Sequence, residues 1–190
     1  PRVGMRVVSA TELFERHAGV LQPLVDFLGA RGRLPGTDEL ASAGEIAGAL
    51  GSIARAGRII KAAVGAEAWE RAELERSEDL LVYLALARFQ RRPPFGSLSR
   101  DLQFDVRAFF RSYERASILA DQILLSVGKP DLIDRACRSS PVGKLTPSAL
   151  YVHESALQDV PPLLRVYEGC ARAFIGTVDG ANVVKLARRE

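Results

Sequence analysis

The chain has 190 residues, of which 47% are hydrophobic and 26% are charged, and this composition is typical of a globular protein and excludes a disordered one. Lys and Arg number 26 against 23 Asp and Glu, so the formal net charge of +3 is only a weak indication of nucleic-acid binding. Two cysteines without a Cys-x-x-Cys pair, together with two histidines, argue against a zinc site and against a disulfide framework.

The N-terminal part of the chain predicts a capped helix followed by a loop. Ser9 and Glu12 have the spacing of a capping box, in which each side chain accepts from the other residue's backbone N–H. Apolar residues at helical spacing continue to Leu28, and Pro23 predicts a kink or a break among them. Residues 32–37 contain Gly and Pro and are expected to form a loop.

Two short helices and one strongly apolar helix are expected next. Ser42 and Glu45 repeat the capping-box spacing, and Ser52 is expected to cap the helix that follows. Residues 77–79 are expected to open the strongest element, because residues 80–87 are apolar on all sides, as in a helix that other helices enclose. This apolar stretch is far shorter than the roughly 20 residues that cross a bilayer, so we expect a cytoplasmic protein without a membrane partner.

The second half of the chain predicts a long helix and then a change of character. Residues 100–127 read as one helix, and residues 139–141 as a break. After this break, residues 150–153 and 182–186 are short β-type runs that flank a helix over residues 161–175. The fold class expected is therefore mainly α, a multi-helix bundle with a small α/β element at the C-terminal end. We place a helical domain at residues 1–138 and a small α/β appendage, truncated at its C-terminus, at residues 139–190.

Arginines before and within the expected long helix are candidate contacts for nucleic acid. Three of them would line one helical face at i, i+4 and i+8, and such a stripe could neutralise phosphates. Glu114 falls on the same face, which favours the alternative of a solvated, ion-paired helix surface. The candidates are Arg88, Arg91, Arg92, Arg100, Arg107, Arg111 and Arg115.

Polar side chains that could carry chemistry concentrate near the C-terminal end. They are Lys144, Tyr151, His153, Glu154, Asn182 and Lys185. A strand over residues 150–153 would place Tyr151 and His153 on one face, although a single His on a short strand is more often structural than catalytic. Cys137 and Cys170 are expected to be core residues.

The helix over residues 161–175 is expected to have an apolar and a charged face. Arg165, Glu168 and Arg172 stand at i, i+3 and i+7, and we favour a structural role for them over a binding role. The opposite face is expected to carry the apolar residues Leu163, Leu164, Tyr167, Cys170, Ala171 and Phe174.

Known cofactor loops are missing from the sequence. The run Gly143-Lys144-Leu145 lacks both the earlier Gly and the Ser or Thr of a phosphate-binding P-loop. No acidic-x-Gly-x-Gly turn is present to bind S-adenosylmethionine. We therefore assign no catalytic residue, no cofactor-binding residue and no metal ligand to this chain.

Two stretches of the sequence resemble the bacterial family of DNA phosphorothioation-associated methyltransferases. The first is residues 78–89 with the downstream residues 101–110, and the second is residues 143–186, which include Tyr-Val-His, Pro-Pro-Leu-Leu-Arg-Val-Tyr-Glu-Gly-Cys-Ala-Arg and Gly-Ala-Asn-Val-Val-Lys-Leu. The resemblance implies a role in DNA modification and restriction, with DNA or other components of a phosphorothioation system as partners. It also implies S-adenosylmethionine as the cofactor of full-length members, in a domain upstream of the portion present here.

Several functions follow as hypotheses. The first is a non-catalytic helical portion of such a methyltransferase that serves defence by binding or positioning. A second is a DNA-binding module that uses the helix with Arg100 to Arg115 together with Arg88, Arg91 and Arg92. The alternative is a helical scaffold for protein–protein interaction without a DNA or enzymatic role. An enzyme built on the C-terminal polar residues would require at least three of them to converge in one pocket.

Overall fold

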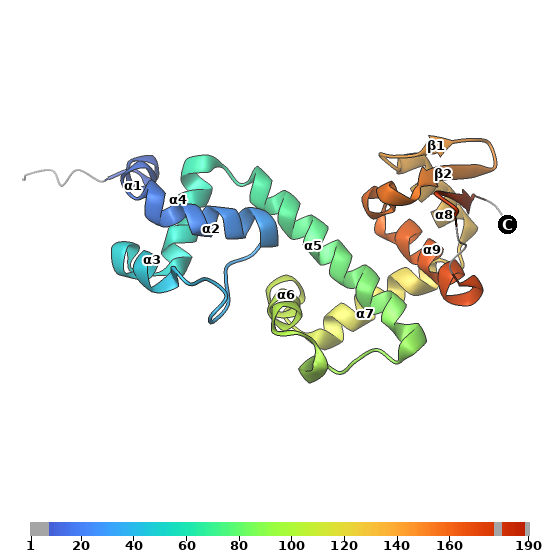
Figure 1. Cartoon of the computed structure of the whole chain (residues 1–190), viewed down its shortest axis with the longest axis horizontal. Coiled ribbons are helices and arrows are strands. Elements are labelled where there is room, and N and C mark those ends of the chain that lie inside the picture. The colour runs from blue at the N-terminus through green and yellow to red at the C-terminus, as the bar shows by residue number, and fades with distance from the viewer. Residues whose placement is uncertain (1–7, 177–179, 189–190) are drawn as a thin grey trace, which may run out of the picture. The chain divides into compact units, whose positions relative to one another are not determined.

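The computed structural model describes residues 8–176 and 180–188, and these residues are mainly helical with a small sheet near the C-terminal end (Figure 1). The fold class predicted from the sequence is confirmed. The contacts between residues divide the chain into two compact units, residues 1–76 (unit 1) and residues 77–190 (unit 2). The domain boundary expected between residues 138 and 139 lies inside unit 2 and stays a prediction.

Unit 1 is a small helical bundle. The capping box of Ser9 and Glu12 is present, but the helix that it opens ends at Arg16, and the next helix runs without a break through Pro23. Ser52 caps its helix as predicted, whereas Ser42 makes no capping hydrogen bond. The helices are α1 (Ala10–Arg16), α2 (Ala18–Arg31), α3 (Ala43–Leu50), α4 (Ile53–Val64) and the first half of α5 (Glu67–Leu86).

The core of unit 1 is closed by α4, which packs against α1, α2 and α3. Its buried side chains are Leu21, Leu24, Leu28, Ile46, Leu50, Ala56, Ile59 and Ile60. Gly32 ends α2 in the left-handed region with φ of 64°, and the indole Nε1 of Trp69 donates to its carbonyl at 2.9 Å. The loop that follows holds an almost fully buried ion pair, in which the guanidinium of Arg33 donates to both carboxylate oxygens of Glu39.

Unit 2 begins within α5, which starts ten residues before the helix start expected at residues 77–79. Leu80, Val82, Leu84 and Ala85 are buried, as the apolar run predicts, but Tyr83 is exposed. The further helical elements are η1 (Ala87–Gln90), η2 (Phe95–Ser97), α6 (Arg100–Phe110), α7 (Tyr113–Ser126), α8 (Pro130–Ser139), η3 (Glu154–Asp159) and α9 (Pro162–Ile175). The single helix predicted over residues 100–127 is wrong, because α6 and α7 are separated at residues 111 and 112.

The sheet of unit 2 has three antiparallel strands in the order β1 (Lys144–Leu145), β2 (Ala149–His153) and β3 (Val183–Ala187). The two predicted strands are thus confirmed as β2 and β3, with α9 between them in sequence, whereas β1 was not predicted. Helices α8 and α9 cover one face of this sheet (Figure 1). Together they bury Ile133, Cys137, Leu150, Val152, Val160, Leu164 and Leu186.

Helix α9 also reaches a second core cluster. Val166 and Cys170 pack with residues of α5, α6 and α7, while Leu164 packs under the sheet. Phe174 is 90% exposed and Ala171 is exposed as well, so the apolar face expected for this helix is not buried along its whole length. Within the described residues, no helix combines the length and the apolar character that crossing a membrane requires.

Candidate functional site

Because α6 and α7 are separate helices, the predicted stripe of arginines along one helix does not form. Arg111 has a φ of 66°, in the left-handed region, and the hydroxyl of Ser112 caps α7 by accepting from the backbone N–H of Arg115 at 3.1 Å. Arg107 therefore belongs to one helix and Arg115 to the next, with Arg111 between them. The i, i+4 and i+8 relation is lost, so the three arginines do not line the face of one helix.

An aromatic pair nevertheless brings these segments together. The rings of Phe95 and Tyr113 lie 5.8 Å apart, and the guanidinium of Arg107 lies 5.1 Å from the centre of the Phe95 ring. The hydroxyl of Tyr113 donates to the carbonyl of Pro93. The loop after η1, the last turn of α6 and the first turn of α7 thus meet at one place in unit 2.

Two of the candidate arginines near this place are occupied by contacts within unit 2. Arg92, whose side chain is only 9% exposed, donates to the carboxylate of Asp121 at 2.5 Å and to the carbonyl of Leu84 at 2.8 Å. Arg92 therefore fastens the loop after η1 to α5 and α7 and is not available to a ligand. Arg88 is more exposed and lies 3.8 Å from the same carboxylate.

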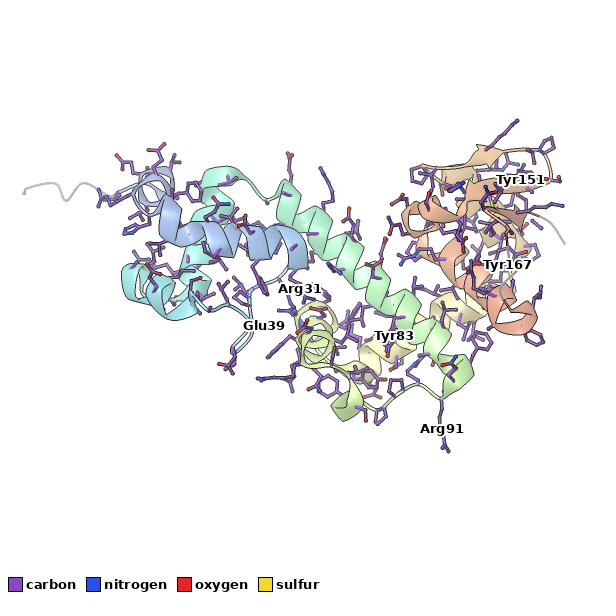
Figure 2. All side chains as sticks on the ribbon, viewed as in Figure 1. Arg31, Glu39, Tyr83, Arg91, Tyr151 and Tyr167 are labelled. Carbon is purple, nitrogen blue, oxygen red and sulfur yellow. The ribbon has the colours of Figure 1, made fainter. Side chains whose placement is uncertain are left out.

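The remaining candidates present their charge to solvent. Arg91, Arg111 and Arg115 are exposed, and within residues 8–176 and 180–188 none of their side chains makes an ion pair. Figure 2 shows the Arg91 side chain extending away from the ribbon. Arg100 is exposed but has an interaction partner. Residues 88–115 contain seven arginines against three acidic residues, so this segment is markedly more basic than the chain as a whole.

The sheet arranges part of the predicted polar cluster in a row. Lys144 of β1 is paired with Tyr151 of β2, and Tyr151 is paired with Lys185 of β3. Cross-strand partners share one face of a sheet, and the exposure of all three residues identifies this as the outer face. Figure 2 labels Tyr151 in this sheet. We call these three residues the lysine–tyrosine row.

The other members of the predicted cluster do not join this row. His153 lies on the same face of β2, but its Nδ1 is within 2.8 Å of the hydroxyl of Ser155, a local contact at the start of η3. The carboxylate of Glu154 instead accepts from Arg172 of α9 at 3.2 Å. Asn182 precedes β3, and its backbone carbonyl accepts from the N–H of Glu154 at 2.9 Å.

A groove of about 480 Å³ opens between the C-terminal half of α9 and β3. Of the six predicted polar residues only Glu154 and Lys185 line it, so this groove does not bring together the three polar residues that an enzyme would require. The apolar lining comes from Tyr167, Ala171, Ile175, Val184 and Leu186. Figure 2 labels Tyr167 on α9. Sequence reasoning did not find this groove, because its two walls are 8 to 20 residues apart in the sequence and meet only in the fold.

Charged residues of α9 are fixed beside the groove. Arg172 donates to Glu168 at 2.7 Å and to Glu154 at 3.2 Å, and these hydrogen bonds to the two carboxylates raise the pKa of Arg172. Arg165 is not part of this cluster, because it pairs with Asp79 of α5 at 2.8 Å. The three residues thus belong to two separate sets of ion pairs, and the structural role expected for them stays a prediction.

The end of β3 is held by a buried arginine that the sequence did not single out. The Nε of Arg188 donates to Asp134 of α8 at 2.6 Å, and its Nη1 donates to the carbonyls of Thr146 and Pro147 at 2.6 Å and 2.9 Å. These bonds tie β3 to α8 and to the turn between β1 and β2. They fix the strand that forms one wall of the groove.

Neither thiol is poised as a nucleophile. Cys137 is buried under the sheet and Cys170 packs against the other core cluster, and burial raises the pKa of both thiols. A raised pKa lowers the thiolate fraction that would react. Across residues 8–176 and 180–188, no group of three or more His, Cys, Asp or Glu side chains is placed to hold a metal ion.

Comparison with models of protein families, with curated proteins and with solved structures finds no match to this chain.

Proposed function

We propose that this chain is a non-catalytic helical portion of a DNA phosphorothioation-associated methyltransferase and that it serves DNA modification or restriction by holding the DNA backbone. The observation that carries the proposal is the exposure of Arg91, Arg111 and Arg115, whose side chains make no ion pair with the described residues. Guanidinium groups bind phosphate oxygens in bidentate geometry, and arginines without a carboxylate partner lose no ion pair on binding.

The non-catalytic part of the proposal rests on the geometry of unit 2. A cofactor such as S-adenosylmethionine commonly binds outside the carboxyl ends of parallel strands, where a glycine-rich turn opens a helix. The described strands are antiparallel, and β2 leads into the short η3 without a glycine-rich turn. The described residues therefore do not fit S-adenosylmethionine, and we derive no methyl-transfer step from them.

Salt-dependent DNA binding tests the proposal. A fluorescein-labelled duplex of mixed sequence is titrated with the chain from about 50 mM to about 200 mM salt, and the slope of log K against log salt is measured by anisotropy. Each phosphate contact contributes about 0.9 to this slope, so losing three contacts reduces it by up to about 2.7. The variant is Arg91→Ala with Arg111→Asn and Arg115→Ala, where Asn suits the left-handed backbone at residue 111.

A matched variant separates site binding from a general charge effect. Arg16→Ala, Arg58→Ala and Arg71→Ala remove the same charge from exposed positions of unit 1. We expect this control to retain the parent's affinity and slope. An absence of DNA binding, binding that ignores salt, or an equal loss in both triple variants contradicts DNA contact at this site. Binding of S-adenosylmethionine with micromolar affinity in calorimetry contradicts the non-catalytic part.

The second candidate function is a helical scaffold for protein–protein interaction without a DNA or enzymatic role. The specific observation in its favour is the apolar end of α9, where Phe174 and Ile175 are 90% and 77% exposed. Failure of the DNA titration together with capture of a defined protein segment at α9 would favour this scaffold over the DNA-binding function.

A further inference from the structure

Strand β3 has an edge without a neighbour in the described part of the chain. Among residues 8–176 and 180–188, β3 pairs only with β2 and ends the strand order β1-β2-β3. A strand edge carries a row of backbone N–H and C=O groups that can bind another extended chain. The edge of β3 is therefore the first feature of a docking surface.

The hydrogen bonds beside β3 show which residues face outward. The carbonyl of Asn182 accepts from Glu154 at 2.9 Å, and the N–H of Arg188 donates to Ser148 at 3.0 Å. Backbone groups alternate in an antiparallel ladder, so even-numbered residues of β3 bond to β2. The N–H and C=O groups of Val183, Lys185 and Ala187 therefore point to the open edge.

The groove beside α9 lies along this edge. Its lining includes the five consecutive residues 183–187, although successive side chains of a strand point to opposite faces. A cavity that touches every residue of a strand must border the edge of that strand. A chain added to β3 would place every second side chain over Ala171, Ile175 and Tyr167 of α9, which are apolar.

The charge of Lys185 determines which residue of an added strand fits on the outer face of the sheet. Lys185 and Lys144 are exposed at the two ends of the lysine–tyrosine row, and within the described residues neither has a carboxylate partner. Among the described residues that line the groove, the other cation is Arg172, which is engaged by Glu154 and Glu168. An added residue directly opposite Lys185 would lie about 5 Å away, where an opposite charge is favourable.

We propose that the edge of β3 and the α9 groove bind an extended segment of a partner protein as a fourth strand, with an acidic residue opposite Lys185 and apolar residues on either side of it. The backbone groups of Val183, Lys185 and Ala187 provide the ladder, and the apolar wall of α9 receives the alternate side chains. This inference is independent of the proposed DNA contact, which uses other residues.

A second copy of the chain fits this edge less well. In the antiparallel pairing of β3 with its own copy that gives the greatest overlap, Lys185 lies opposite Lys185, and like charges directly opposite each other are destabilising. Lysine on an edge strand is also a common protection against edge-to-edge association. An acidic segment of another protein relieves this charge.

The test uses the full chain and two blocked peptides of alternating threonine and valine, with either glutamate or lysine at the central threonine position. Binding is followed by NMR, and amide hydrogen exchange is measured residue by residue. We expect the glutamate peptide to bind at least about twofold more tightly than the lysine peptide. At about ten times Kd, exchange at Val183, Lys185 and Ala187 should slow about tenfold, because binding protects amides by mass action.

Two pairs of variants separate the backbone ladder from the charge. Val183→Pro removes one outward N–H and should abolish binding, whereas Val183→Thr keeps this N–H and should bind like the parent. Lys185→Glu should reverse the preference toward the lysine peptide, while Lys144→Glu, two strands from the edge, should change it much less. The DNA titration of the Val183→Pro variant should be unchanged, which keeps the two proposals separable.

Four results would overturn the inference. The first is that neither peptide binds, and the second is that both bind equally. The third is protection from exchange that is no greater at the outward-facing amides than elsewhere, and the fourth is equal affinity of the Val183→Pro and Val183→Thr variants. Concentration-dependent dimerisation through β3, measured by analytical ultracentrifugation, would assign the edge to a second copy and would also overturn it.

Discussion

Replacement of Arg188 by alanine should destabilise unit 2 far more than replacement of Arg138, although both arginines bind the same carboxylate. Arg188 donates to Oδ1 of Asp134 and to two backbone carbonyls, and its side chain is only 6% exposed. Arg138 donates to Oδ2 of Asp134 at 2.9 Å, one helical turn away on α8, and its side chain is 54% exposed.

Burial sets the expected magnitudes. Removal of one partner of a buried ion pair costs about 3–5 kcal/mol when the other charge is left unpaired. Asp134 is half-buried and keeps Arg138, so we expect Arg188→Ala to lower the free energy of unfolding by about 2–4 kcal/mol, mainly through the lost hydrogen bonds to the carbonyls of Thr146 and Pro147. Arg138→Ala removes an exposed i,i+4 pair and should cost less than about 0.5 kcal/mol.

Urea unfolding followed by far-UV circular dichroism measures both variants, and hydrogen exchange at Val184 and Leu186 reports on β3 directly. The hydrogen bond from Arg138, more than that from Arg188, lowers the pKa of Asp134 against the opposing effect of desolvation. The folded state thus binds this proton less readily than the unfolded state, so the contribution of Asp134 is complete above its ordinary pKa near about 4 and is lost at more acidic pH. A loss for Arg188→Ala that is no larger than that for Arg138→Ala would refute the reasoning from burial.

Three further predictions concern residues of both units. Gly32→Ala should lower the free energy of unfolding by more than about 3 kcal/mol in urea, because its Cβ would lie 2.1 Å from the backbone N of Glu73. Gly51 has a similarly positive φ but no close neighbour, so Gly51→Ala should cost only about 1–2 kcal/mol. Burial raises the pKa of Glu39, but hydrogen bonds from Arg33 and the N–H of Gly36 outweigh this effect and leave the pKa lowered. Glu39→Ala should therefore cost about 2–4 kcal/mol at pH 7 and progressively less as the pH falls below about 4, and a cost independent of pH would contradict this assignment. Cys137 and Cys170 should react with iodoacetamide at pH 8 much more slowly in the folded chain than in urea, as mass spectrometry would show, and equal rates would contradict their burial.

The sequence predicted correctly those elements whose geometry depends only on residues close together in the chain. The box of Ser9 with Glu12 and the cap at Ser52 depend on residues three positions apart, and both formed as predicted. The short β-type runs expected at residues 150–153 and 182–186 also formed strands, over Ala149–His153 and Val183–Ala187. Ser42 has the same spacing to Glu45, but its backbone is not extended, with φ of −80° and ψ of 3°, so its hydroxyl does not reach the N-terminal N–H groups.

The candidate sites depended on geometry that local patterns do not contain. The end of α6 carries no Gly or Pro that would have signalled it in the sequence. Instead Arg111 takes the left-handed conformation there, and the cap at Ser112 starts a new helix. This single residue separated the predicted arginine stripe. The pairing of Lys144 with Tyr151 and of Tyr151 with Lys185 required the register of three strands, which the sequence of each strand does not specify.

The position of the docking groove follows from how α9 is buried. Leu164 packs under the sheet and Val166 packs into the other cluster, and residues two apart on a helix point about 200° apart, so the first half of α9 is covered on opposite sides. Beyond Cys170 neither cluster continues, and Ala171, Phe174 and Ile175 emerge exposed. The helix that joins the two cores therefore leaves apolar side chains at its end, and β3 runs beside that end with an edge that no other described strand pairs with. The apolar wall and the backbone ladder that the proposed strand would use thus have one structural origin.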